Sequence, residues 1–180
     1  MAGYQQDIRT RGFRKVIRVI PTLSTDAYAD NDVLFDSTEI PNAVSRPGGT
    51  SSLVRIEIHN HLDTTLDMDL VFTENQANLG SINEDAGTDS LWTETLAKAS
   101  NLLGHARIDM SDSEIDLVNS LLSSTNLGAP TIGATSQPAG SPLFLQAAEN
   151  STSVYFAGMD RTGGLTFGAN DLEFIFHIEY

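Results

Sequence analysis

The most constraining feature of this sequence is the alternation of apolar and polar residues along its last ten positions. The apolar members of this segment are Leu172, Phe174, Phe176, Ile178 and Tyr180. Successive side chains of a β-strand point to opposite faces of a sheet, so a period of two predicts a half-buried strand over 171–180. A strand that runs to the last residue indicates that this end of the chain is held in a sheet.

The same alternation recurs at 52–62 and at 66–73. Shorter apolar runs predict four more strands, at 13–23, 32–40, 143–148 and 153–159. Clusters of Gly, Pro, Asn, Asp and Ser separate these segments, as turns require. Short strands joined by turns of this kind favour a mainly β protein, an antiparallel β-sandwich or a barrel.

The 52–62 and 66–73 segments are close enough to predict a hairpin with 63–65 as its turn. The inward-facing pairs would then be Ile58 with Leu70 and Ile56 with Phe72. A slip of one residue would bury aspartates, so we expect this register to be well specified.

The outer face of that hairpin holds the arrangement that most resembles a metal site. Its members are His59, His61, Asp67 and Asp69. Zinc accepts both imidazole nitrogen and carboxylate oxygen. Exposed cross-strand His–Asp contacts explain the same pattern without an ion. We therefore expect a solvent-facing cluster, with His59 opposite Asp69 and His61 opposite Asp67, and no structural metal.

The middle of the chain has a different pattern and predicts a loop and helix insertion at about 74–142. Residues 74–90 and 126–142 are rich in loop-forming residues. The apolar spacing over 89–99 predicts one short helix, which includes Trp92. Ser111 and Glu114 fit a capping box, which predicts a second helix over 112–122.

Two oxygen-rich stretches raise calcium as an alternative. One contains Asp26, Asp30, Asp32 and Asp36, and the other is 83–89. Neither has the ligand spacing of an EF-hand, and turn formation explains Asp and Asn equally well.

No catalytic motif is present. The sequence has no Gly-x-Ser-x-Gly elbow, no P-loop and no His-Glu-x-x-His. It has no cysteine, which excludes disulfides, thiolate metal sites and thiol nucleophiles. We therefore interpret the chain as a structural or binding protein without a cofactor, and not as an enzyme.

Charge is distributed unevenly along the chain. The net charge is −14, yet five of the ten basic residues lie within ten positions, at Arg9, Arg11, Arg14, Lys15 and Arg18. The acidic remainder should repel nucleic acid. We predict an N-terminal arm over 1–12 and one domain over 13–180. The basic residues would bind a partner or form a strand that faces water. No apolar stretch approaches the length of a membrane span, and no signal peptide is visible.

Several segments together resemble a known group of proteins. They are 27–34 (AYADNDVL), 40–50 (IPNAVSRPGGT), 53–58 (LVRIEI), 66–72 (LDMDLVF) and 165–174 (LTFGANDLEF). This pattern resembles the auxiliary virion proteins of tailed bacteriophages, the capsid decoration, cement and head-fibre class. Asn31 stands where that class more often has glycine.

The resemblance implies a jelly-roll-like sandwich with no catalytic residues. It also implies a homo-oligomer, most often a trimer, that is made in the host cytoplasm and binds the major capsid protein on the virion surface. The alternative function is a carbohydrate-binding fibre or lectin-like module. A lectin would expose two or three aromatic side chains, and the candidates here are Tyr4, Tyr28 and Trp92.

Overall fold

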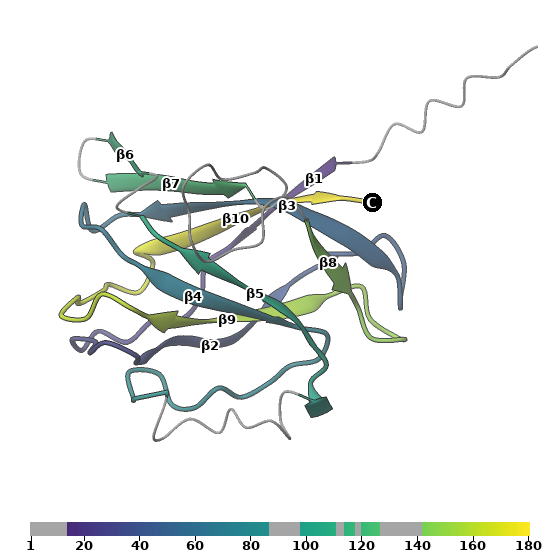
Figure 1. The fold of residues 1–180 in the computed structure, drawn as a ribbon, viewed down its shortest axis with the longest axis horizontal. Coiled ribbons are helices and arrows are strands. Elements are labelled where there is room, and N and C mark those ends of the chain that lie inside the picture. The colour runs from purple at the N-terminus through teal and green to yellow at the C-terminus, as the bar shows by residue number, and fades with distance from the viewer. Residues whose placement is uncertain (1–13, 87–97, 111–113, 118–119, 127–141) are drawn as a thin grey trace, which may run out of the picture.

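A computed structural model describes residues 14–86, 98–110, 114–117, 120–126 and 142–180. Ten strands in these residues form two antiparallel sheets that pack face to face (Figure 1). Helical backbone is found at residues 98 and 99 alone within the described ranges. No helix in these ranges has the length and apolar character needed to cross a membrane.

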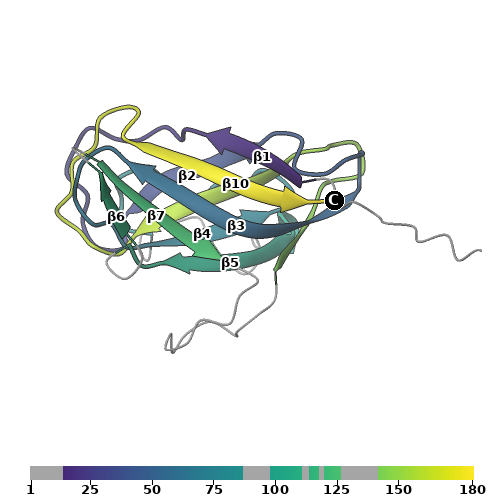
Figure 2. The ribbon, with the colours of Figure 1, turned by 90° about the horizontal axis from the view of Figure 1, so that it is seen from above.

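The first sheet has six strands. Its order is β1 (Arg14–Val19), β10 (Leu172–Glu179), β3 (Thr50–Asn60), β7 (Ser120–Asn126) and β6 (Glu114–Leu117). The sixth strand, β8 (Leu143–Gln146), pairs with the beginning of β3, whereas β7 pairs with its end. β3 and β10 therefore form the centre of this sheet, and β1 and β6 lie toward its two sides (Figure 2).

The second sheet has four strands in the order β2 (Val33–Ile40), β9 (Val154–Asp160), β4 (Met68–Thr73) and β5 (Leu102–Ile108). Across both sheets the strand pairs are nested. β1 pairs with β10, β2 with β9, β3 with β7, and β4 with β5. Strands from the first half of the chain thus pair with strands from the second half in reverse order. The pairs β1–β10 and β3–β7 lie in the six-stranded sheet, and the pairs β2–β9 and β4–β5 lie in the four-stranded sheet.

Aromatic rings from both sheets meet in the core. Phe156 lies between 4.8 and 6.3 Å, centroid to centroid, from four other rings, those of Phe35, Phe72, Phe174 and Phe176. All five side chains are fully buried. Because two of the rings come from β10 and three from the four-stranded sheet, this cluster joins the two layers.

A smaller apolar cluster lies on the other side of the four-stranded sheet. The segment 74–86 crosses this face and packs Leu79 against Val33 and Ala157. The backbone N–H of Leu79 also donates to Asp36 Oδ1 at 2.8 Å. Residues that the sequence predicted to be a loop therefore cover part of this sheet.

All seven strands that the sequence predicted are present, with ends that differ by a few residues. The predicted mainly β, antiparallel, two-sheet fold is confirmed. The segment 171–180 is confirmed as a strand held between β1 and β3.

The predicted hairpin between 52–62 and 66–73 is wrong. β3 and β4 lie in different sheets, so Ile58 pairs with Phe174 and Ser123, while Leu70 pairs with Ala106 and Gly158. Two strands that face each other across a core show the same alternation as two strands that pair side by side. The connection also lacks the Asn-Gly or Asp-Gly of a tight hairpin.

Asn60 fixes the bend that carries the chain from one sheet to the other. Its side chain is fully buried. Nδ2 donates to the Thr64 carbonyl at 2.6 Å, and Oδ1 accepts from the Leu62 N–H at 3.0 Å. A buried amide that satisfies two backbone groups holds 60–64 in a local loop, which prevents these residues from continuing as a two-stranded ladder.

The predicted helix over 112–122 is also wrong, because β6 and β7 occupy this region. Ile115 and Leu117 lie on one face of β6, as the period of two requires. The range 74–142 supplies β5, β6 and β7 to the two sheets. The predicted helix at 89–99, with Trp92, lies outside the described residues except for its last two positions.

Candidate functional site

The basic segment that the sequence singled out forms β1 and pairs with β10. Arg14 Nε lies 2.6 Å from Glu179 Oε1, and Arg18 Nη1 lies 2.9 Å from Glu173 Oε1. Lys15 Nζ donates to the Asn42 carbonyl at 3.1 Å. The side chains of Arg14 and Arg18 are nevertheless 81% and 63% exposed. Arg9 and Arg11 lie outside the described residues.

β1 also presents apolar side chains to solvent. Val16 is 54% exposed, and Ile20, which follows the strand, is 52% exposed. They share the outer face with Arg14 and Arg18, whereas Ile17 and Val19 are buried in the core. In the described part of the chain β1 pairs with β10 alone, so its other edge has backbone groups available for a partner.

Histidines gather on the outer face of the six-stranded sheet. The rings of His59 and His61 are 4.2 Å apart, and His59 Nε2 lies 3.3 Å from Ser120 Oγ. Burial, and then the neighbouring His61, lower the pKa of His59. Glu173 Oε2 is 4.0 Å from His59 Nδ1 and opposes this shift. His59 is therefore mostly neutral at pH 7.

The expected cluster of His59, His61, Asp67 and Asp69 does not form. The histidines lie at the end of β3, and the aspartates lie at β4 in the other sheet. Asp69 pairs with arginines, and Asp67 Oδ1 accepts from the Met110 N–H at 3.0 Å. Within the described ranges no three His, Asp or Glu side chains are placed to hold a metal ion together.

Asp69 instead organises two arginines at the end of the four-stranded sheet. Arg107 donates from Nε to Oδ1 at 2.7 Å and from Nη2 to Oδ2 at 2.8 Å. Arg161 Nε lies 3.2 Å from Oδ2 of the same carboxylate. The hydrogen bonds from Arg107 lower the pKa of Asp69 and raise the pKa of Arg107. Paired N–H donors fix the guanidinium plane of Arg107.

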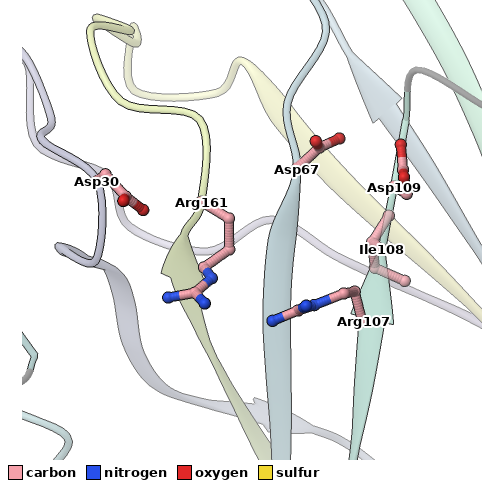
Figure 3. A pocket seen from close by; sticks show the side chains of 6 residues that line it. All are labelled: Asp30, Asp67, Arg107, Ile108, Asp109 and Arg161. Carbon is pink, nitrogen blue, oxygen red and sulfur yellow. The ribbon is translucent and has the colours of Figure 1, made fainter. Parts of the chain in front are cut away.

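These arginines open onto a charged hollow of about 310 Å³. The residues that line it are Asp30, Asp67, Arg107, Ile108, Asp109 and Arg161. In Figure 3 the side chains of Arg161 and Arg107 come from either side of β4, and the carboxylates of Asp30, Asp67 and Asp109 lie above them. Such a mixture of acceptors and donors suits a ligand rich in hydroxyl or charged groups.

A buried carboxylate supports the loop that presents Arg161. Asp160 is fully buried, and its two oxygens accept from the N–H groups of Thr162 at 2.8 Å and Gly163 at 3.2 Å. Burial raises the pKa of Asp160. Its bonds to the backbone indicate a structural role in shaping 160–163.

The sequence interpretation did not identify Arg107, Arg161 or Asp160. The alternation of His105-Ala106-Arg107-Ile108 could have revealed β5 and the outward direction of Arg107. No local pattern marks Arg161, because its place depends on the pairing of β9 with β4.

Two of the aspartates raised as calcium ligands, Asp32 and Asp36, accept hydrogen bonds from the backbone. Asp32 Oδ2 accepts from the Ala29 N–H at 2.6 Å, and Asp36 binds the backbone of Leu79. The described part of the second stretch, 83–86, lies beside the first, since the backbones of Asp32 and Asp85 form an isolated β-bridge.

The aromatic candidates for sugar stacking are also placed only in part. Tyr28 is 2% exposed and donates its hydroxyl to the Leu34 carbonyl at 3.0 Å. Tyr4 and Trp92 lie outside the described residues. Phe144 on β8, which the sequence interpretation had not named, is 67% exposed.

No protein-family model matches the chain, and no curated protein sequence is significantly similar to it. The case for a function therefore depends on the residues and their geometry.

Proposed function

We propose that this protein is a structural component of a tailed-phage virion, a decoration protein that binds the major capsid protein on the particle surface. The proposal rests on the backbone conformation and packing of the segments that resemble phage proteins. Asn31, where the phage class more often has glycine, has a φ of 74°, the backbone region that glycine adopts most easily. Gly48 in the second segment has a φ of 64°.

Two aromatic residues of the pattern, Tyr28 and Phe167, pack against each other in the core. Tyr28 is buried against Phe167, with ring centroids 5.6 Å apart, which joins the first and last resembling segments. The strands of the remaining segments supply the core. The turn positions of the pattern adopt turn backbone, and its apolar positions pack in the core. This agreement supports a shared fold better than sequence similarity alone.

We infer that the sandwich is a jelly roll. The nested pairing of β1 with β10, β2 with β9, β3 with β7 and β4 with β5 supports this, because it is the order of a ribbon rolled into two four-stranded layers. β6 and β8 would then be additions to one layer.

The function in this proposal is geometric. A rigid sandwich docks on the capsid lattice and bridges neighbouring capsid subunits, and lattice symmetry makes many modest contacts act together. The resemblance implies a trimer for the docking unit. No catalytic step or cofactor is part of this role.

The proposal is tested on particles of the phage that encodes this chain. Density-gradient fractions are analysed by quantitative mass spectrometry, with the major capsid protein as the internal standard. We expect the chain to sediment with DNA-filled particles in a fixed ratio to the capsid protein. A chain that stays in the soluble fraction, or is present in only a few copies per particle, contradicts a decoration role.

The charged hollow favours carbohydrate binding as a second candidate function. Carboxylates and guanidinium groups are suitable partners for sugar hydroxyls. The measurement is saturation-transfer NMR with a panel of simple sugars on the wild type, on Asp109→Asn in the hollow, and on Asp116→Asn on β6 as the control. A signal that Asp109→Asn alone abolishes supports this function, and the absence of a signal for all sugars opposes it.

A further inference from the structure

We propose that copies of this protein associate head to tail, with the β1 edge of one copy against the β6 edge of the next. In the described part of the chain, β1 pairs with β10 alone and β6 pairs with β7 alone. These two strands lie on opposite sides of the six-stranded sheet (Figure 2). Each therefore has one side on which backbone donors and acceptors can bind another strand.

Exposed apolar side chains concentrate at these two edges. Of the six large apolar residues that are exposed in the described ranges, four lie there: Val16, Ile20, Ile115 and Leu117. Val16 is 54% exposed and Ile115 is 59% exposed.

Strand register places both edges' apolar residues on one face of the sheet. Val16 pairs with His177, which pairs with Arg55. Ile115 pairs with Leu122, which pairs with His59. Arg55 and His59 are both on the outer face of β3, because Ile56 and Ile58 are buried beneath. A copy placed edge to edge would therefore set the apolar side chains of β1 beside those of β6 on one continuous face.

The two edges carry opposite charge. β1 contains the basic residues Arg14, Lys15 and Arg18, whereas β6 contains the acidic residues Glu114 and Asp116 and no basic one. Strand register places Lys15 on the same side of the sheet as the exposed Asp116 of the neighbour, because their pairing partners Ile178 and Leu121 are both buried. Like charges oppose contact between two β1 edges or two β6 edges, and complementary charges favour β1 against β6.

When the β1 edge of one copy binds the β6 edge of another, the first copy still has a free β6 edge and the second a free β1 edge. Such a contact forms a ring if the rotation between copies closes, and an open filament if it does not. Closure after three copies would give the trimer that the phage resemblance implies. This inference goes beyond the proposed function, because it names the contact between copies and does not require a capsid.

The test begins with two single variants, Val16→Glu on β1 and Ile115→Lys on β6. Both residues are more than half exposed, so we expect circular dichroism and melting like those of the wild type. Sedimentation velocity should show an oligomer for the wild type and a dissociation constant at least about tenfold higher for each variant. High salt should weaken the wild-type oligomer.

Mixing the two variants separates this contact from all symmetric ones. The Ile115→Lys copy keeps an intact β1 edge, and the Val16→Glu copy keeps an intact β6 edge. We expect each variant alone to be monomeric and the mixture to form a one-to-one dimer. If Ile115→Lys alone still forms dimers, the contact joins two β1 edges and the proposal is overturned.

Phe144→Glu is the matched control, because Phe144 is 67% exposed on β8, which pairs with the beginning of β3 and belongs to neither β1 nor β6. Its oligomer should equal that of the wild type. A wild-type chain that is monomeric at every concentration, or a mixture that stays monomeric, also overturns the proposal. Neither result changes the composition of phage particles, so failure here is distinct from failure of the virion role.

Discussion

The outer faces of the two sheets are completed in different ways. On the four-stranded sheet, the segment 74–86 lies across the strands, and Leu79 is only 3% exposed. On the six-stranded sheet, charged and polar side chains stand in rows. Ile175, an apolar residue among them that pairs with Arg18 and Glu57, is only 6% exposed.

This difference indicates where partners can bind. On the four-stranded sheet, the segment 74–86 already covers part of the outer face. The site on this sheet that stays open to a ligand is the hollow around Arg107 and Arg161. A face covered only by side chains stays accessible, and its edge strands keep unused hydrogen-bonding groups. The association surface is therefore expected on the six-stranded sheet.

The largest effect should come from the core that both sheets share. Phe156→Ala removes the ring that contacts four others and should lower the free energy of unfolding by about 3–5 kcal/mol. Phe144→Ala, at an exposed site, should change it by less than about 0.5 kcal/mol. Urea denaturation measures both. Equal costs would mean that the phenylalanine cluster does not join the layers.

A smaller effect tests the cover on the four-stranded sheet. Leu79→Ala should cost about 2 kcal/mol or more, because it opens a cavity against Val33 and Ala157. Leu102→Ala is the control, since Leu102 on β5 of the same sheet is 49% exposed and should lose less than about 0.5 kcal/mol. Similar small losses for both would show that 74–86 does not contribute a second core.

The same contrast explains what the sequence predicted and what it missed. Strands with one buried face were found because alternation reports burial directly, as in 171–180. Which strand pairs with which was not found, because Ile58 and Leu70 face a common core whether they lie in one sheet or in two. The buried Asn60, which makes the difference, is a polar residue at an inward position of the alternation, and it stands between the polar His59 and His61.

The misassigned helix has a related cause. A capping box and a run of apolar residues are local signals, and the pairing of β6 with β7 and β3 is not local. The candidate site was predictable only in its basic part, where Arg14, Lys15 and Arg18 are close in sequence. The hollow combines residues from β4, β5 and the end of β9, so its residues come together only after the strands pair.

Ion pairs on the two sheets should respond differently to pH. Asp69→Asn removes the acceptor of two arginines and should cost about 1–2 kcal/mol near pH 7. The lowered pKa of Asp69 means that the folded protein binds this proton less readily than the unfolded chain. Its stabilisation is therefore complete above the ordinary pKa of 3.8 and is lost as pH falls through the lowered value.

Urea denaturation of the wild type and of Asp69→Asn is measured at about pH 7 and about pH 3. The difference in unfolding free energy between the two proteins should be smaller at the lower pH. Glu179→Gln on the six-stranded sheet is the control, because its partner Arg14 is 81% exposed and the pair should be worth less than about 1 kcal/mol. A gap between wild type and Asp69→Asn that is the same at both pH values would contradict the assigned role of this carboxylate.

The smallest effect on stability should follow deletion of residues 1–12. The deletion keeps β1 and its pairing with β10, and it removes Arg9 and Arg11 but leaves Arg14 and Arg18 with their glutamate partners. The melting temperature should therefore be nearly unchanged. Occupancy on phage particles, measured at low and high salt, should fall sharply and in a salt-dependent way, since arginines on a partner's carboxylates act as an ionic network. Unchanged occupancy at both salt concentrations would mean that the arm, with Arg9 and Arg11, has no part in docking.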